Sequence, residues 1–190
     1  MKKIMLIIVC LIAVISSFAQ SSHLEFKNIP IDGKLSDFVS KLEKEGFVFK
    51  KYARDYVAVM EGVFAGNYAT IYILATPESK IVWKVTAGYN EKESWNSLKS
   101  DYLEIRSLYT TKYGAPEHFE FFSKPYYEGD GYELQALRKE KCTYASFYSL
   151  PLGTVVVEIT QFCKVQVGYE DKSNYEIKKK EEEKAALNDI

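Results

Sequence analysis

Apolar and polar residues alternate with a period of two along much of this chain, and short turn signals separate the alternating segments. The clearest case is the run from residue 155 to 167. One parity is taken by Glu158, Thr160, Lys164 and Gln166, and the other by Val155, Val157, Ile159, Cys163, Val165 and Val167. Such alternation is typical of antiparallel strands with one buried face and one wet face. We therefore expect antiparallel meanders to dominate the fold.

Two segments have helical spacing instead. The first runs from about Ser36 to Glu45 and is followed by Gly46, and the second runs from about Glu91 to Tyr113. Gly114 follows the second segment and Pro116 comes soon after it. Glycine accepts the left-handed conformation that ends a helix, and proline prevents the helix from resuming.

The order of these elements indicates a repeat. Each predicted helix precedes a run of strands. Asp130-Gly131, within the second run, is the strongest hairpin signal in the chain. We therefore predict an α+β fold, with antiparallel meanders and helices packed on one face, built from a duplicated α-β-β-β unit. The expected strands are 56–64, 68–75 and 80–89 in the first half, and 117–127, 132–142, 143–148, 154–162 and 164–169 in the second.

The first nineteen residues predict export. Lys2 and Lys3 precede an apolar run, and Ser17-Phe18-Ala19 forms a small-x-small cleavage sequence, as in secretory signal peptides. We predict cleavage after Ala19 and a periplasmic or secreted product without a lipid anchor or a membrane span. Residues 20–170 are then expected to form a single α+β domain with repeat halves of about 24–89 and 90–170. Residues 171–190 are expected to form a solvated C-terminal helix or tail.

The charge balance argues against one class of partner. Without residues 1–19 the chain keeps 23 basic and 26 acidic residues, a net charge of −3 with the signs interspersed. A nucleic-acid-binding protein needs a basic patch, so we expect no nucleic-acid partner. The fifteen Tyr against eleven Phe favour half-exposed positions in a sheet, because tyrosine combines an apolar ring with a polar tip.

Two cysteines remain after the predicted cleavage. Cys142 and Cys163 lie on either side of the turn signal Pro151-Leu152-Gly153, and counting outward from that turn brings them opposite each other to within one residue. The sequence therefore predicts a cross-strand disulfide, with two buried free thiols as the alternative if a bulge shifts the register. Either role is structural, because neither cysteine has the neighbours of a reactive thiolate.

Motifs for common catalytic chemistry are missing from the sequence. It contains no Gly-x-Ser-x-Gly, no His-Glu-x-x-His and no phosphate-binding glycine loop, and we expect neither a cofactor nor a metal site. Acidic residues could still serve a glycosidase, which needs two carboxylates across a cleft. Glu61, inside an apolar run, is the best single candidate and Glu158 is second. A surface position beside a Lys or Arg is the other interpretation of both.

One segment gathers aromatic and acidic side chains. Tyr126, Tyr127, Asp130 and Tyr132 are expected near the tip of one hairpin, where rings and a carboxylate would project together. That mixture suits sugar stacking or a contact with a peptide. The alternative is that half of these tyrosines belong to the core.

Three phrases resemble those of known proteins. Residues 26–35 (FKNIPIDGKL), the helix end Lys112-Tyr113-Gly114-Ala115-Pro116 and the closing residues 169–174 (YEDKSN) resemble uncharacterised secreted proteins of gut Gram-negative bacteria. More loosely, the tandem order is similar to that of β-lactamase-inhibitor-like and small envelope-assembly proteins. The looser likeness implies a protein partner bound through a concave sheet.

The leading hypothesis is an exported, non-enzymatic module that binds a protein, peptide or glycan on the wet, Tyr-rich face of an antiparallel sheet. A carboxylate-dependent glycan hydrolase and an assembly factor of an envelope complex are the alternatives. An assembly factor would expose an apolar patch to an obligate partner.

Overall fold

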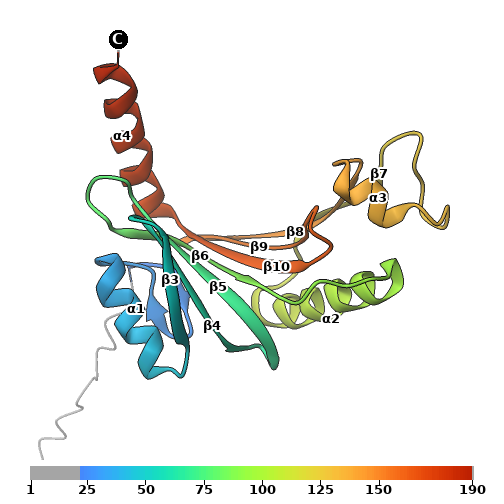
Figure 1. Cartoon of the computed structure of the whole chain (residues 1–190), viewed down its shortest axis with the longest axis horizontal. Helices are drawn as coiled ribbons and strands as arrows, with labels where there is room; N and C mark the ends of the chain where they lie inside the picture. The colour runs from blue at the N-terminus through green and yellow to red at the C-terminus, as the bar shows by residue number, and fades with distance from the viewer. Residues whose placement is uncertain (1–21, 190) are drawn as a thin grey trace, which may run out of the picture.

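The computed structural model describes residues 22–189, so the predicted signal peptide and its cleavage position lie outside the described residues. Within this range, an eight-stranded antiparallel sheet is accompanied by a two-stranded hairpin and four helices (Figure 1). The elements in chain order are β1 (Glu25–Phe26), β2 (Ile29–Pro30), α1 (Leu35–Lys44), β3 (Val48–Arg54), β4 (Val57–Phe64), β5 (Asn67–Ala75), β6 (Val82–Gly88), α2 (Trp95–Tyr113), β7 (Glu117–Phe122), α3 (Glu133–Arg138), β8 (Cys142–Leu150), β9 (Gly153–Ile159), β10 (Val165–Asp171) and α4 (Lys172–Asn188).

The α+β class with an antiparallel sheet is confirmed, and the strand order has two halves. The order is β3-β4-β5-β6-β10-β9-β8-β7, so each half is a helix followed by a four-stranded meander, and β6 pairs with β10 at the centre. The repeating unit thus has four strands where three were predicted. In the first half the added strand is β3, a segment that begins directly after Phe47 and pairs with β4 through two register shifts.

Both long helices bury the face that their sequence spacing predicts. α1 buries Leu35, Phe38, Val39 and Leu42, and α2 buries Trp95, Leu98, Tyr102, Ile105 and Tyr109, all in one hydrophobic cluster with the strands. Figure 1 shows the two helices below the sheet. α2 begins later than predicted, with Ser94 as its N-cap, because the amides of Tyr89 and Lys92 donate to Val165 and Cys163 and hold this stretch beside β10.

The C-terminal helix is mostly exposed and stands at one end of the opposite sheet face. Its first turn is capped by Asp171, whose side chain accepts from the Asn174 amide. The ring of Tyr175 packs against Trp83 with centroids 5.5 Å apart, and Glu181 accepts from the amides of Glu78 and Ser79. These contacts fix α4 to the β5–β6 turn and to β6, so the helix forms a wall beside the sheet (Figure 1).

The predicted strand over residues 132–142 is wrong, and with it the hairpin at Asp130-Gly131. Asp130 accepts hydrogen bonds from the amides of Tyr127 and Tyr132, which folds the segment into a compact loop instead of a two-residue turn. The following residues, Glu-Leu-Gln-Ala-Leu-Arg, are strong helix formers and make α3, which buries Ala136 and Leu137. Local helix propensity and the aspartate loop therefore override the hairpin signal.

Candidate binding surface

One face of the sheet has no helix packed over its middle. Residues of alternate parity along the central strands turn away from α1 and α2, and we call the surface they form the open face. Their cross-strand neighbours identify them row by row: Tyr72, Thr86, Gly168, Val156 and Phe147 form one row, and Thr70, Gly88, Gln166, Glu158 and Ala145 form the next. The parity predicted for residues 155–167 is confirmed by these pairings.

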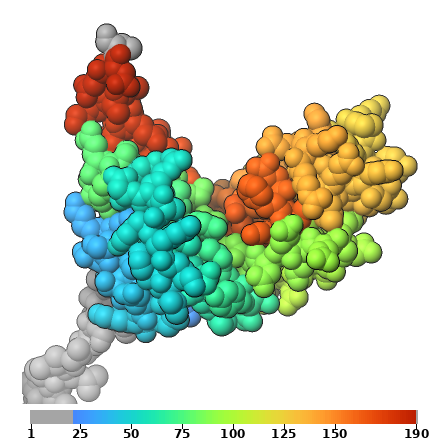
Figure 2. Space-filling model, in the orientation of Figure 1, coloured from blue at the N-terminus to red at the C-terminus, as the bar shows by residue number. Residues whose placement is uncertain are grey.

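The middle of the open face is a shallow hollow of about 310 Å³. Two glycines lie where the two halves of the sheet meet: Gly168 of β10 pairs with Thr86 of β6, and Gly88 of β6 pairs with Gln166 of β10. Figure 2 shows the surface hollowed between α4 and the part of the chain that carries α3. The hollow is lined by Lys84, Phe147, Thr154, Val156, Glu158, Gln166, Gly168 and Glu170.

The charges in this hollow do not balance. Lys84 and Glu170 form an ion pair of 3.4 Å, directly opposite each other across β6 and β10. Glu158 accepts a hydrogen bond of 2.6 Å from Gln166 and, within residues 22–189, has no cation at ion-pair distance. The hollow therefore carries one carboxylate whose charge no neighbouring side chain neutralises.

Aromatic rings flank the hollow on both sides. Tyr72 of β5 is 42% exposed on one side. On the other side Phe147 of β8 packs edge-to-face against Phe119 of β7, with ring centroids 5.9 Å apart at 79°. Aromatic rings that keep part of their surface in solvent are favourable anchors for a binding partner, because their burial removes a large apolar area from water.

Glu61, the catalytic candidate of the sequence, lies on the open face but outside the hollow. Its carboxylate accepts from the Tyr68 hydroxyl at 2.7 Å and pairs with Lys50 at 3.0 Å. These hydrogen bonds hold the pKa of Glu61 below its usual value. The group is thus ionised at neutral pH, and its surroundings match the surface ion pair that was the alternative interpretation.

The four residues predicted near a hairpin tip lie instead on the loop between β7 and α3, and Tyr132 is the last residue of this loop. Tyr127 and Tyr132 are exposed, whereas Tyr126 is partly buried and packs against the core. Both carboxylate oxygens of Asp130 are used by loop amides, at 3.0 and 2.7 Å. Asp130 therefore shapes the loop, and the two exposed tyrosines are the members of the set that present rings to solvent.

The predicted disulfide between Cys142 and Cys163 is wrong, and both cysteines are free and buried. Leu150 pairs with Gly153 around a two-residue turn, and this register places Cys142 beyond the end of β9. Cys163 lies in the β9–β10 turn, where its amide donates to the Thr160 carbonyl. Burial raises the pKa of Cys142 to about 12, so its thiol is protonated and unreactive at neutral pH.

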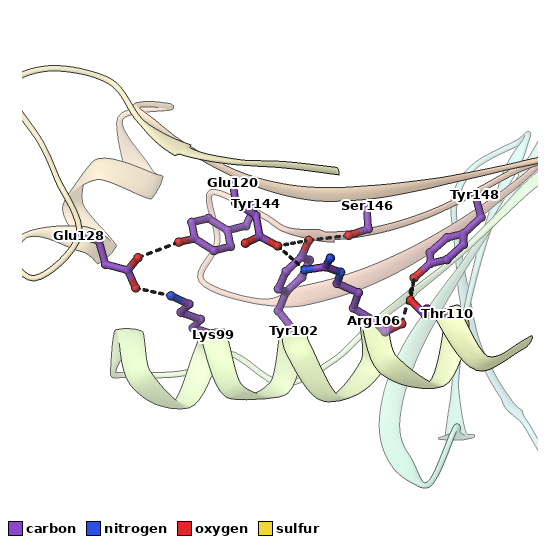
Figure 3. A network of polar contacts seen from close by, with 9 residues as sticks. All are labelled: Lys99, Tyr102, Arg106, Thr110, Glu120, Glu128, Tyr144, Ser146 and Tyr148. Atoms are coloured by element: carbon purple, nitrogen blue, oxygen red, sulfur yellow. Dashed lines mark hydrogen bonds and ion pairs between the residues drawn. The ribbon is translucent and has the colours of Figure 1, made fainter. Parts of the chain in front are cut away.

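A polar seam beneath the second half of the sheet supports the open face from behind (Figure 3). The buried hydroxyl of Tyr102 in α2 bonds to Ser146 of β8 at 2.7 Å, and Arg106 of α2 pairs with Glu120 of β7 at 2.6 Å. At the N-terminal end of α2, Glu128 pairs with Lys99 and accepts from the Tyr144 hydroxyl. At the other end, the Tyr148 hydroxyl donates to the Arg106 carbonyl. The seam fixes β7 and β8 to the helix and limits their movement.

A larger cavity of about 610 Å³ lies between the β1–β2 hairpin and the C-terminal part of α2. Its walls include core and hairpin residues such as Leu24, Phe64 and Tyr169. His23, Glu25 and Lys27 add polar groups to its rim.

Sequence reasoning identified the parity of residues 155–167 but not which strands lie beside them in the sheet. Lys84, Gly168 and Phe147 belong to one surface only because β6 pairs with β10 across the centre, a contact for which the sequence carries no local signal.

Comparisons of the chain with protein-family models, with curated proteins and with solved structures find no match. No helix among residues 22–189 is both long and apolar enough to cross a membrane. In the same range, His, Cys, Asp and Glu side chains form no group of three or more that could hold a metal ion.

Proposed function

We propose that this protein is an exported, non-enzymatic module that binds a protein partner on the open face of its sheet. The partner is a convex protein surface that places a Lys or Arg side chain over Glu158 and apolar side chains against Tyr72 and Phe147. Export is the prediction from the N-terminal signal sequence, and the looser likeness to β-lactamase-inhibitor-like proteins implies the same mode of binding.

The observation that carries this proposal is the unneutralised Glu158 in a hollow flanked by aromatic rings. A carboxylate on a partly covered surface gains from a cation that replaces its water, and rings at the rim exclude water around such a pair. Two other acidic groups of the open face differ, because Lys84 and Lys50 already neutralise Glu170 and Glu61. Glu117 lies on the same face at the β7 edge, opposite Phe147, but outside the hollow. A partner cation placed in the hollow would therefore select Glu158.

A site-specific photo-crosslink tests the proposal in an envelope extract of the source organism. A benzophenone amino acid replaces Tyr72 in one variant and Phe147 in another, and a third variant carries it at Leu103, an exposed residue of α2. We expect one protein to be captured from positions 72 and 147 and not from position 103. Capture should fall at least tenfold in Glu158→Lys, which reverses the charge. Equal capture from all three positions, or capture unaffected by Glu158→Lys, would refute the proposal.

A glycan hydrolase is the second candidate, and one observation favours it. Glu158 and Glu170 both line the same hollow, so two carboxylates face one space, as glycosidases require. The test is hydrolysis of envelope and dietary polysaccharides by the native protein, followed by Glu158→Gln, Glu170→Gln and Glu61→Gln. A hydrolase should lose at least a hundredfold in rate in two of these variants. Binding of a glycan without turnover would instead favour a lectin-like module.

A further inference from the structure

The two edges of the sheet differ in how they discourage further pairing. At one edge, β3 contains two register shifts and carries Lys50, Lys51 and Arg54, features that keep other strands away. At the other edge, β7 pairs with β8 through six consecutive residue pairs without a shift. β7 contains neither proline nor lysine, and within residues 22–189 no strand covers its outer side. The edge at β7 thus lacks the bulges, proline and lysines that would hinder pairing, and its charged residues are Glu117 and Glu120.

The backbone of β7 shows which residues face outward. The amide of Ser123, one residue beyond β7, donates to the Lys141 carbonyl at 2.7 Å and continues the β7–β8 ladder. Because hydrogen-bonding groups alternate in direction along an antiparallel strand, odd-numbered residues of β7 bond to β8. The N–H and C=O groups of His118, Glu120 and Phe122 therefore point away from the sheet.

We propose that a second copy of this chain pairs with β7 through its own β7, antiparallel and with Phe119 opposite Phe119 on the two-fold axis. In this register His118 faces Glu120 of the second copy, and Glu120 faces His118 of the second copy. These two residue pairs exchange four backbone hydrogen bonds, and the two eight-stranded sheets become one sheet of sixteen strands.

Hydrogen-bond complementarity between His118 and Glu120 selects both the occupant and the register. His118 and Glu120 point to the α2 side of the sheet, opposite Ser146 and Tyr144 of β8. The contacts of Glu120 with Arg106 and Tyr102 both use Oε1, so Oε2 can accept from the imidazole of the second copy. Sliding the second copy by two residues, the smallest slide that keeps the faces aligned, would put Glu120 opposite Glu120 or His118 opposite His118. Only the proposed register joins unlike groups.

The same register covers apolar surface on the open face. Phe119 is 43% exposed and Phe121 is 50% exposed. Phe119 and its counterpart form the central pair without backbone bonds, the kind of pair in which side chains approach most closely. The pairing is independent of the protein partner proposed above, although it would join two open faces edge to edge.

Oxidative cross-linking of two cysteine variants tests the register. In Phe119→Cys the two Cα atoms would lie about 4.5 to 5.5 Å apart, within the range of a disulfide. In Phe121→Cys, the matched control, residue 121 faces residue 117 of the second copy, and the two cysteines would lie about 13 Å apart. The native cysteines of the mature protein are buried and should stay silent. We expect a disulfide-linked dimer for Phe119→Cys and at least tenfold less for Phe121→Cys.

Sedimentation velocity of the purified mature protein, from micromolar to millimolar concentration, tests the association itself. His118→Pro removes an outward N–H, and an edge strand tolerates proline there. We expect the native protein to shift from monomer to dimer, and His118→Pro to associate at least tenfold more weakly with an unchanged thermal midpoint. A native protein that stays monomeric, or equal cross-linking of the two cysteine variants, would overturn the proposal. Neither result bears on capture at positions 72 and 147, so the two proposals fail separately.

Discussion

The substitution Asp171→Ala should be among the most destabilising single changes in this protein. Asp171 is fully buried, and its carboxylate accepts from the amide of Leu24 at 2.8 Å and from the amide of Asn174 at 2.9 Å. His23 contributes a third contact at 3.1 Å. The residue thus joins the beginning of the described chain to the first turn of α4.

The size of the effect follows from the two amides. Each buried N–H that loses its acceptor costs about 1 to 3 kcal/mol, and the amide of Asn174 also loses its helix cap. We expect the free energy of unfolding to fall by about 3 kcal/mol. For a domain of this length, the thermal midpoint should fall by about 6 to 12 °C. Asp171→Asn keeps one oxygen acceptor and should lose about half as much.

Urea unfolding followed by circular dichroism measures these differences. The matched control is Glu170→Ala, which removes the neighbouring carboxylate from a partly exposed ion pair with Lys84 and should cost less than about 1 kcal/mol. A loss below about 1 kcal/mol for Asp171→Ala, with an unchanged slope against urea, would show that water satisfies both amides. The reasoning from burial would then be refuted.

Three further predictions concern single sites. Gly153→Ala should lower the free energy of unfolding by about 3 kcal/mol in the same urea assay, because the added Cβ would lie 2.1 Å from the Glu170 carbonyl oxygen; a loss below about 1 kcal/mol would contradict the close approach. Tyr89→Phe should leave the free energy of unfolding unchanged or raise it by up to about 1 kcal/mol, because the Tyr89 hydroxyl is buried without a hydrogen-bond partner among the described residues. A clear loss of stability would indicate that a bound water satisfies this hydroxyl. The hydrogen bond from the Lys99 ammonium holds the pKa of Glu128 below its usual value. The stability that Glu128 contributes is therefore present above about pH 4.5 and is lost as the pH falls through the lowered pKa of the folded state. Between pH 6 and pH 3, the free energy of unfolding should therefore fall less in Glu128→Gln than in the native protein. An equal fall in the two proteins would count against this ion pair.

The sequence predicted those elements whose signals are local. Spacing and glycine ends located α1 and α2, and alternation located the strands around the Pro151-Leu152 turn. The failures have a common origin in competition between local signals. Asp130-Gly131 has the composition of a hairpin turn, but the Asp130 side chain bonds two loop amides, and helix formers follow. The disulfide failed for a related reason: with Leu150 opposite Gly153, Cys142 lies opposite position 161, two residues from Cys163, and local sequence does not specify this register.

The candidate site was less predictable than the fold because it is assembled from distant segments. Glu61 and the tyrosines around Asp130 stood out in the sequence, since each lies in a distinctive local context. The hollow of the open face depends on the pairing of β6 with β10, which brings Lys84 beside Glu170. The sequence around Lys84 and the sequence around Glu170 contain no pattern that predicts this contact.

The joint between β6 and β10 also has a consequence for how the chain folds. Within each meander, neighbouring strands are joined by short turns or by α3, whereas Val85 pairs with Tyr169, so closing the central ladder restricts a loop of more than eighty residues. Closing a loop of that length costs entropy before any contact offsets the cost. The amides of the two meanders should therefore become protected earlier than those of the β6–β10 ladder. The hollow would then be the last part of the sheet to exist, and it would exist only in molecules whose halves have already folded.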